Sequence, residues 1–136
     1  MPIDEAVAEP LAGRTLGGEG HGFVIAEWAD DGESSRERPI APLHLHRQDD
    51  EAWYVLQGRM GFQLGDDTVE VGPGSAVRAA PGVPHTFWNA GDAGARYVIV
   101  MTPRIARLIE RLHTLAERTP ESLRALFEEH ASTLLA

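Results

Sequence analysis

The sequence contains no cysteine, and this absence limits the chemistry available to the chain. Disulfide bonds, thiolate metal sites and a cysteine nucleophile are all excluded. The strong metal ligands that remain are histidine and the carboxylates. Because a chain without disulfides fits a reducing compartment, we expect a cytoplasmic protein.

Positive charge and long hydrophobic runs are also scarce. Twelve basic residues, all of them arginine, stand against 21 acidic residues, which gives a net charge of -9 at pH 7. A surface with this net negative charge has no electrostatic attraction to nucleic acid or to an anionic membrane. No segment reaches the roughly 18 consecutive apolar residues of a membrane span. Residues 1–10 also lack the basic start and apolar core of a signal peptide. We therefore expect neither nucleic acid nor a membrane as a partner.

The chain of 136 residues is long enough for one domain with a hydrophobic core. We predict an N-terminal arm over residues 1–20, a β-barrel over residues 21–101 and a helical tail over residues 102–136. In the middle part, short runs of strand-forming residues alternate with Gly/Pro turns, as is typical of antiparallel sandwiches and barrels. This part has no helical periodicity, which disfavours a parallel α/β sheet.

The tail carries two helix-start signals. Thr102-Pro103 and Thr119-Pro120 each place an N-cap residue before a proline at the first helical position. Apolar residues follow each signal at helical spacing. The tail is therefore predicted to form two short amphipathic helices that pack on the barrel, with a dimer contact as the alternative.

Three histidines and one glutamate carry the chemistry of the sequence. His44 and His46 are separated by one residue, so on a strand both imidazoles project from the same face and can bind one metal ion. Glu51 begins the next predicted strand and can return its carboxylate to the same interior space. His85 opens a more distant strand and would supply a third imidazole. These side chains can meet only if the sheet curls into a barrel.

The spacing of these residues resembles the cupin family, small β-barrel or jelly-roll proteins defined by two motifs. The first motif, G-x5-H-x-H-x3,4-E-x6-G, is matched by His44, His46, Glu51 and Gly58, with Arg38 in place of the leading glycine. The second motif, G-x5-P-x-G-x2-H-x3-N, is matched by Gly74, Gly82, His85 and Asn89, with Ala80 in place of the proline. The departures affect turns and leave the ligand positions intact. The resemblance covers residues 40–101.

The resemblance implies a mainly β fold, an antiparallel β-barrel or jelly roll, with two short C-terminal α-helices. It also implies one divalent transition metal, with His44, His46, Glu51 and His85 as ligands. Such a donor set suits Fe, Mn, Ni, Co, Cu or Zn, and the order of affinities does not choose among them. The alternative is a vestigial site in which the four residues form a buried polar cluster. The family further implies a homodimer, with residues 1–29 at the interface.

Trp53 and Val55 follow Glu51, and Phe87 follows His85, at a spacing of two, while Phe62 and Leu64 are expected on a neighbouring strand. Tyr97 and Met101 share a face with Ile99 and could reach the same space. We predict an apolar, aromatic pocket lined by these residues, although plain barrel core is the more common role for each of them. The predicted pocket residues are Trp53, Val55, Phe62, Leu64, Phe87, Tyr97 and Met101. Such a pocket suits an aromatic or enolic small molecule better than a phosphorylated sugar.

By this resemblance, the chain is expected to be a metal-dependent enzyme similar to quercetinase-like single-domain cupins, and hence a dioxygenase. Glu51 would either ligate the metal or act as general base, with its pKa raised by apolar walls. One alternative is a non-catalytic cupin that senses or stores a ligand or metal. Another is an isomerase or epimerase of sugar-like substrates, which the scarcity of Lys and Arg near the inferred pocket disfavours.

Overall fold

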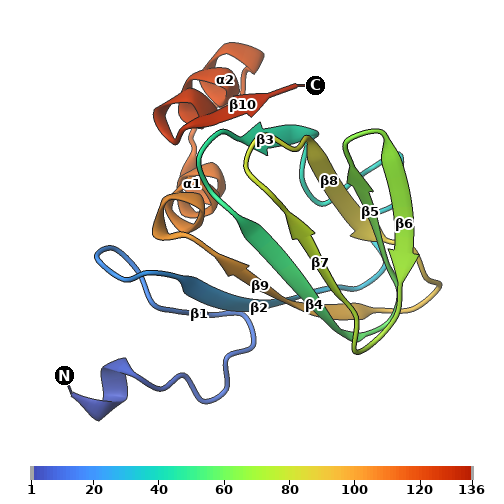
Figure 1. Cartoon of the computed structure of the whole chain (residues 1–136), viewed down its shortest axis with the longest axis horizontal. Helices are drawn as coiled ribbons and strands as arrows, with labels where there is room; N and C mark the ends of the chain where they lie inside the picture. Colours follow the sequence, from blue (N-terminus) through green and yellow to red (C-terminus); the bar gives the residue numbers. More distant parts are fainter. Residues whose placement is uncertain (1, 136) are drawn as a thin grey trace.

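Two five-stranded antiparallel sheets pack face to face in the computed structural model, which describes residues 2–135 (Figure 1). The first sheet contains β1 (Thr15–Leu16), β2 (Val24–Asp30), β9 (Ala95–Met101), β4 (Glu51–Gln57) and β7 (Ala76–Ala79), in that spatial order. The second contains β10 (Ser132–Leu134), β3 (His44–His46), β8 (His85–Asn89), β5 (Met60–Leu64) and β6 (Asp67–Val71). A short 3-10 helix, η1 (Ile3–Glu5), lies near the N-terminus.

The predicted mainly β fold is confirmed, in the form of a jelly-roll sandwich. Among residues 2–135, every hydrogen-bonded strand pair lies within one sheet or the other, so the two sheets do not close into a continuous barrel. The ligand-bearing strands therefore meet across the space between two sheets.

The core forms where the inward faces of the two sheets meet. Along β4, buried and more accessible residues alternate, which is the period expected of a strand with one face turned to the core. Trp53 on β4 packs against Phe62 on β5 and Phe87 on β8, with ring centroids 5.3 Å apart in both pairs. These contacts join the first sheet to the second.

Two helices, α1 (Pro103–Thr114) and α2 (Pro120–Glu129), begin at the predicted prolines. The side chain of Thr102 accepts a hydrogen bond from the Ile105 amide, and Thr119 forms a capping box with Ser122. Figure 1 shows both helices and the end of the chain gathered at one end of the sandwich. None of the helices within residues 2–135 is long and apolar enough to cross a membrane. The division into arm, barrel and tail at residues 20 and 101 stays a prediction.

The last strand, β10, is a feature that the sequence did not predict. After α2 the chain turns through Ala131, whose φ of 54° lies in the left-handed region, and then pairs antiparallel with β3. In this pairing Ser132 is opposite His46, and Leu134 is opposite His44. The C-terminal end of the chain thus lies beside the strand that carries two of the predicted ligands.

Gly61 tests how closely β5 packs against Trp88 on the neighbouring strand β8. A β-carbon at this position would overlap the indole of Trp88, which is buried and lies on the neighbouring strand β8. We expect Gly61→Ala to lower the free energy of unfolding by about 1–3 kcal/mol, the usual cost of overpacking. Urea denaturation measures the change.

The matched control is Gly22→Ala, because a β-carbon at Gly22 meets nothing within 4 Å. An unchanged unfolding free energy in Gly61→Ala would mean that Trp88 moves aside without cost.

Candidate metal centre

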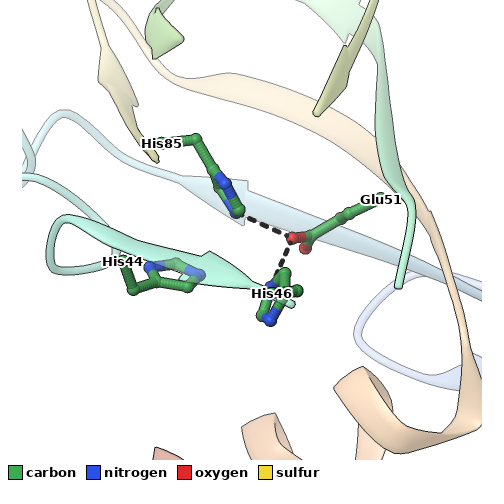
Figure 2. Close-up of side chains that lie close together, drawn as sticks. All are labelled: His44, His46, Glu51 and His85. Carbon is green, nitrogen blue, oxygen red and sulfur yellow. Dashed lines mark hydrogen bonds and ion pairs between the residues drawn. The ribbon is translucent and has the colours of Figure 1, made fainter. Parts of the chain in front are cut away.

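Four predicted ligands converge at one point between the two sheets (Figure 2). His44 and His46 come from β3, His85 comes from β8, and Glu51 is the first residue of β4 in the opposite sheet. All four side chains are buried, with exposed fractions between 1% and 6%. One possible ligand atom from each lies within 4.8 Å of those of the other three.

Local strand geometry explains how three of these side chains meet. In β3 the two histidines are buried on one face, while Leu45 between them is more accessible. His44 is paired with His85 across the β3–β8 ladder. Cross-strand partners project from the same face of a sheet, so the three imidazoles gather together. Their ring centroids lie between 4.3 and 5.1 Å apart.

Glu51 bridges two of the imidazoles. Its Oε1 lies 3.1 Å from Nε2 of His46 and 3.2 Å from Nε2 of His85 (Figure 2). The carboxylate therefore lies on the Nε2 side of both rings.

The Nδ1 atoms of two histidines face backbone carbonyls. His44 Nδ1 donates to the Pro42 carbonyl oxygen at 2.6 Å, and His85 Nδ1 donates to the Val83 carbonyl oxygen at 2.9 Å. A carbonyl oxygen only accepts hydrogen bonds, so each Nδ1 must carry the proton. Nε2 is then the nitrogen left for a metal ion, which would take the place of the proton that His85 Nε2 donates to Glu51. Supporting hydrogen bonds orient metal-binding histidines in this way.

The charge states of His44 and Glu51 also suit a metal site. Burial, reinforced by the neighbouring His85 and His46, lowers the pKa of His44 to about 4, so its imidazole is neutral at pH 7. Burial alone would raise the pKa of Glu51, but hydrogen bonds from His46 and His85 outweigh it and lower the pKa to about 2. The expectation of a raised Glu51 pKa was therefore wrong, because imidazoles rather than apolar walls surround the carboxylate. Neutral imidazole and ionised carboxylate are the forms that bind metals.

The donor set fits a divalent transition metal. Ligand atoms that share one ion at about 2.0–2.2 Å lie at most roughly 4.4 Å apart, so only a few tenths of an ångström separate the observed 4.8 Å from that span. The strong ligands are nitrogen and carboxylate oxygen, which suit several first-row metals.

A cavity of about 360 Å³ opens onto this cluster. His44, His46 and Glu51 form part of its lining, together with Phe87 and Tyr97. Much of the remaining wall is aliphatic and aromatic and comes from the two helices: Ile105, Leu108, Ile109 and Leu112 from α1, and Leu123 and Phe127 from α2. The sequence showed the apolar stripes of these helices but gave no sign of which surface they cover.

Of the seven predicted pocket residues, two line this cavity and five do not. Phe87 and Tyr97 are at the wall. The side chains of Trp53, Val55, Phe62 and Met101 are buried in the core, and Leu64 is half-buried and packs against the same core. Trp53 still contacts the cluster, because its ring centroid lies 5.5 Å from that of His85 in an edge-on arrangement.

Two further polar side chains line the cavity. His113 on α1 and Arg118 in the connection between the helices are both exposed. Arg118 donates through Nη2 to the Leu112 carbonyl oxygen. The sequence gave no sign of an arginine here, because the connection between the helices lies over the cavity only through tertiary packing.

The loop that joins His46 to Glu51 is held by contacts with α1. Arg104 on α1 lies with its Nε 3.1 Å from Oδ2 of the buried Asp49, and its Nη1 donates to Gln48 at 3.2 Å. Because Asp49 and Gln48 lie between two of the predicted ligands, α1 restricts the loop that sets their separation.

Comparison with known proteins agrees with this architecture. A family profile described as a cupin domain matches residues 37–101. No curated protein sequence matches the chain. Among solved structures, a cupin protein from Bacteroides fragilis is 17% identical with a TM-score of 0.53, over 60% of this chain and 66% of that one. The chain belongs to the cupin family, as the sequence predicted.

Two other solved structures have more specific descriptions. The polyketide cyclase RemF from Streptomyces resistomycificus is 31% identical with a TM-score of 0.53, over 66% of this chain and 63% of that one. A sugar phosphate isomerase from Silicibacter pomeroyi is 24% identical with a TM-score of 0.51, over 60% of this chain and 51% of that one. The chain therefore spans between 51% and 66% of the length of these three proteins.

Removing one imidazole tests whether the cluster holds a metal. We expect His85→Ala to weaken divalent-metal binding by more than about 100-fold, since even residues that only support a ligand contribute about 10- to 100-fold. Metal-free protein titrated against a competing chelator measures the affinity.

His21→Ala is the control, because this histidine is exposed and its Nδ1 only accepts a hydrogen bond from the Gly18 amide. Equal metal affinity in His85→Ala and the unmodified protein would exclude His85 as a ligand.

Proposed function

We propose that this cupin is a metal-dependent enzyme of dioxygenase type that acts on an aromatic or enolic small molecule. In this proposal His44, His46 and His85 hold one divalent transition metal, and Glu51 either ligates the same ion or leaves it to accept a proton from substrate. The bound ion would supply Lewis-acid and redox chemistry at the floor of the cavity. The reaction would consume dioxygen and transfer both of its oxygen atoms to the substrate.

The observation that carries the proposal is the continuity of the cluster with a largely apolar cavity. Three of the four predicted ligands lie in the wall of the same cavity as Phe87, Tyr97 and the apolar side chains of both helices. Small-molecule sites in proteins have this composition, with few polar groups in an apolar concavity. The volume of about 360 Å³ suits a molecule of one or two rings.

Glu51 is the group best placed to receive a proton from substrate. Its carboxylate is ionised at neutral pH and lies in the cavity wall. A substrate hydroxyl or an acidic C–H beside a carbonyl could transfer its proton to Glu51 Oε2 or Oε1. Such a proton transfer forms the enolate that then reacts.

Tyr97 and Arg118 would orient the substrate. Burial, with contributions from Asp30 and Glu51, raises the pKa of Tyr97, so its phenol stays protonated and can donate a hydrogen bond in the cavity. Arg118 supplies the one guanidinium among the described residues of the lining. A substrate with a carboxylate or phenolate away from the reacting carbon would match this charge.

Cyclisation of an enolic substrate is the second candidate, favoured by the 31% identity with the polyketide cyclase RemF. Such a reaction also begins with proton removal beside a carbonyl, but it forms a carbon–carbon bond within the substrate and consumes no dioxygen. The aromatic cavity and Glu51 would serve both reactions.

Other functions have less support from the cavity. Isomerisation or epimerisation of a sugar-like substrate would call for more polar groups than these apolar walls offer. A non-catalytic role in sensing or storing a ligand or metal is compatible with the cluster but gives Glu51 no role as a proton acceptor. We further propose a cytoplasmic homodimer that contains residues 1–29 in its interface.

Oxygen uptake separates these functions. Protein loaded in turn with Fe, Mn, Ni, Co, Cu and Zn would be mixed with flavonols, diketones, hydroxylated aromatics and poly-β-ketones while dissolved oxygen and products are monitored. Oxygen loss with product formation supports the dioxygenase. Product without oxygen loss supports cyclisation, and stoichiometric metal without turnover of any substrate supports a binding role.

Glu51→Gln tests the assignment of the proton acceptor. The amide retains the shape of the carboxylate but not its basicity, so we expect metal to be retained and kcat to fall by about 100-fold or more. Metal content and steady-state turnover, measured on the same sample, separate these effects.

Glu70→Gln serves as the control, because Glu70 is an exposed residue of β6 outside the cavity lining. Full activity in Glu51→Gln would show that another group accepts the proton.

A further inference from the structure

Ser132 on β10 contacts the metal cluster from outside the ligand set. Its side chain is completely buried, with an exposed fraction of 0%. The hydroxyl lies 2.7 Å from Nδ1 of His46 and 3.0 Å from the carbonyl oxygen of His130. Neither cupin motif includes this residue, which follows His46 by 86 positions.

The two contacts of this hydroxyl fix the direction of its hydrogen bonds. A serine hydroxyl has one proton, and the His130 carbonyl oxygen can only accept. The proton of Ser132 therefore points to His130, and an oxygen lone pair faces His46. His46 must then donate from Nδ1. Its Nε2, which otherwise donates to Glu51 Oε1 at 3.1 Å, is left to offer its lone pair when a metal ion replaces the Nε2 proton.

His46 differs in this respect from the other two imidazoles. His44 and His85 donate to the carbonyl oxygens of Pro42 and Val83, which allow no other direction. A hydroxyl can donate as well as accept, so Ser132 would permit either tautomer of His46 if it were not itself bound to His130. The bond from Ser132 to His130 removes that freedom.

We propose that Ser132 is a positioning residue of the metal centre, which holds His46 in the Nδ1–H tautomer and turns its Nε2 toward the metal. This inference rests on the metal-binding part of the proposed function. It makes the C-terminal strand a component of the centre, because the hydroxyl acts on the metal only through His46.

The surrounding structure holds Ser132 in place. In the β10–β3 ladder Ser132 is the direct partner of His46. The adjacent Arg47 donates through Nη1 to the Ser132 carbonyl oxygen at 2.8 Å and to Thr133 Oγ1 at 2.8 Å. The same nitrogen lies 2.9 Å from a carboxylate oxygen of Glu128 on α2. These contacts tie β10 and the end of α2 to the strand that carries His46.

Ser132→Ala is the direct test. The variant removes the acceptor for His46 Nδ1, and we expect the affinity for Zn, measured by chelator competition, to fall by about 10- to 100-fold. Thr68→Val is the control in the same sheet, because Thr68 is exposed on β6 and its hydroxyl contacts Arg36 and no ligand. Circular dichroism and thermal unfolding establish that both variants are folded.

The tautomer of His46 gives a second measurement that a merely structural role for Ser132 would not move. Histidine ¹⁵N resonances of the Zn-loaded protein should show His46 protonated at Nδ1 and ligated through Nε2. In Ser132→Ala the Nδ1 proton should lose its hydrogen bond and exchange faster with solvent. Unchanged Zn affinity and unchanged exchange in the alanine variant would overturn the proposal.

The same measurement separates this inference from the proposed function. If the unmodified protein bound no metal, the metal-dependent function would fail, while the ¹⁵N spectrum of the metal-free protein would still test Ser132. A proton on Nε2 alone, with Ser132 donating to Nδ1, would overturn the positioning role. If the unmodified protein bound Zn and Ser132→Ala bound it equally well, only the role of Ser132 would fail.

Discussion

The contact between one buried carboxylate and two imidazoles is the constraint on which this structure depends. An isolated carboxylate in a protein interior costs several kcal/mol of free energy. Glu51 is 4% exposed, and its Oε1 lies within 3.2 Å of Nε2 in both His46 and His85. Because Glu51 belongs to one sheet and the two histidines to the other, the two sheets must pack in one register for the carboxylate to be stabilised.

The supporting hydrogen bonds extend this constraint through the fold. Each imidazole has its Nδ1 engaged by a different partner: the Pro42 carbonyl, the Ser132 hydroxyl and the Val83 carbonyl. These partners lie in two loops and the last strand. The geometry of the cluster therefore depends on segments well outside the two motif strands.

The C-terminal segment connects the metal centre to the cavity above it. The two helices supply apolar walls, their connection carries Arg118, and β10 places Ser132 behind His46. The ring of Phe127 on α2 lies 5.4 Å from that of His44 in an edge-on arrangement. A change in this segment can thus affect both the shape of the substrate site and the orientation of a ligand.

The sequence by itself determined the four members of the cluster, the mainly β fold and the starts of both helices. These features depend on spacing along the chain: His-x-His on one strand face, Gly/Pro turns between short strands, and threonine–proline pairs at helix starts. Only the tertiary structure decided the wall of the cavity, the low pKa of Glu51 and the partnership of Ser132 with His46. Each of these depends on which segments meet in space, and contacts between residues 86 positions apart leave no periodic signal in the sequence.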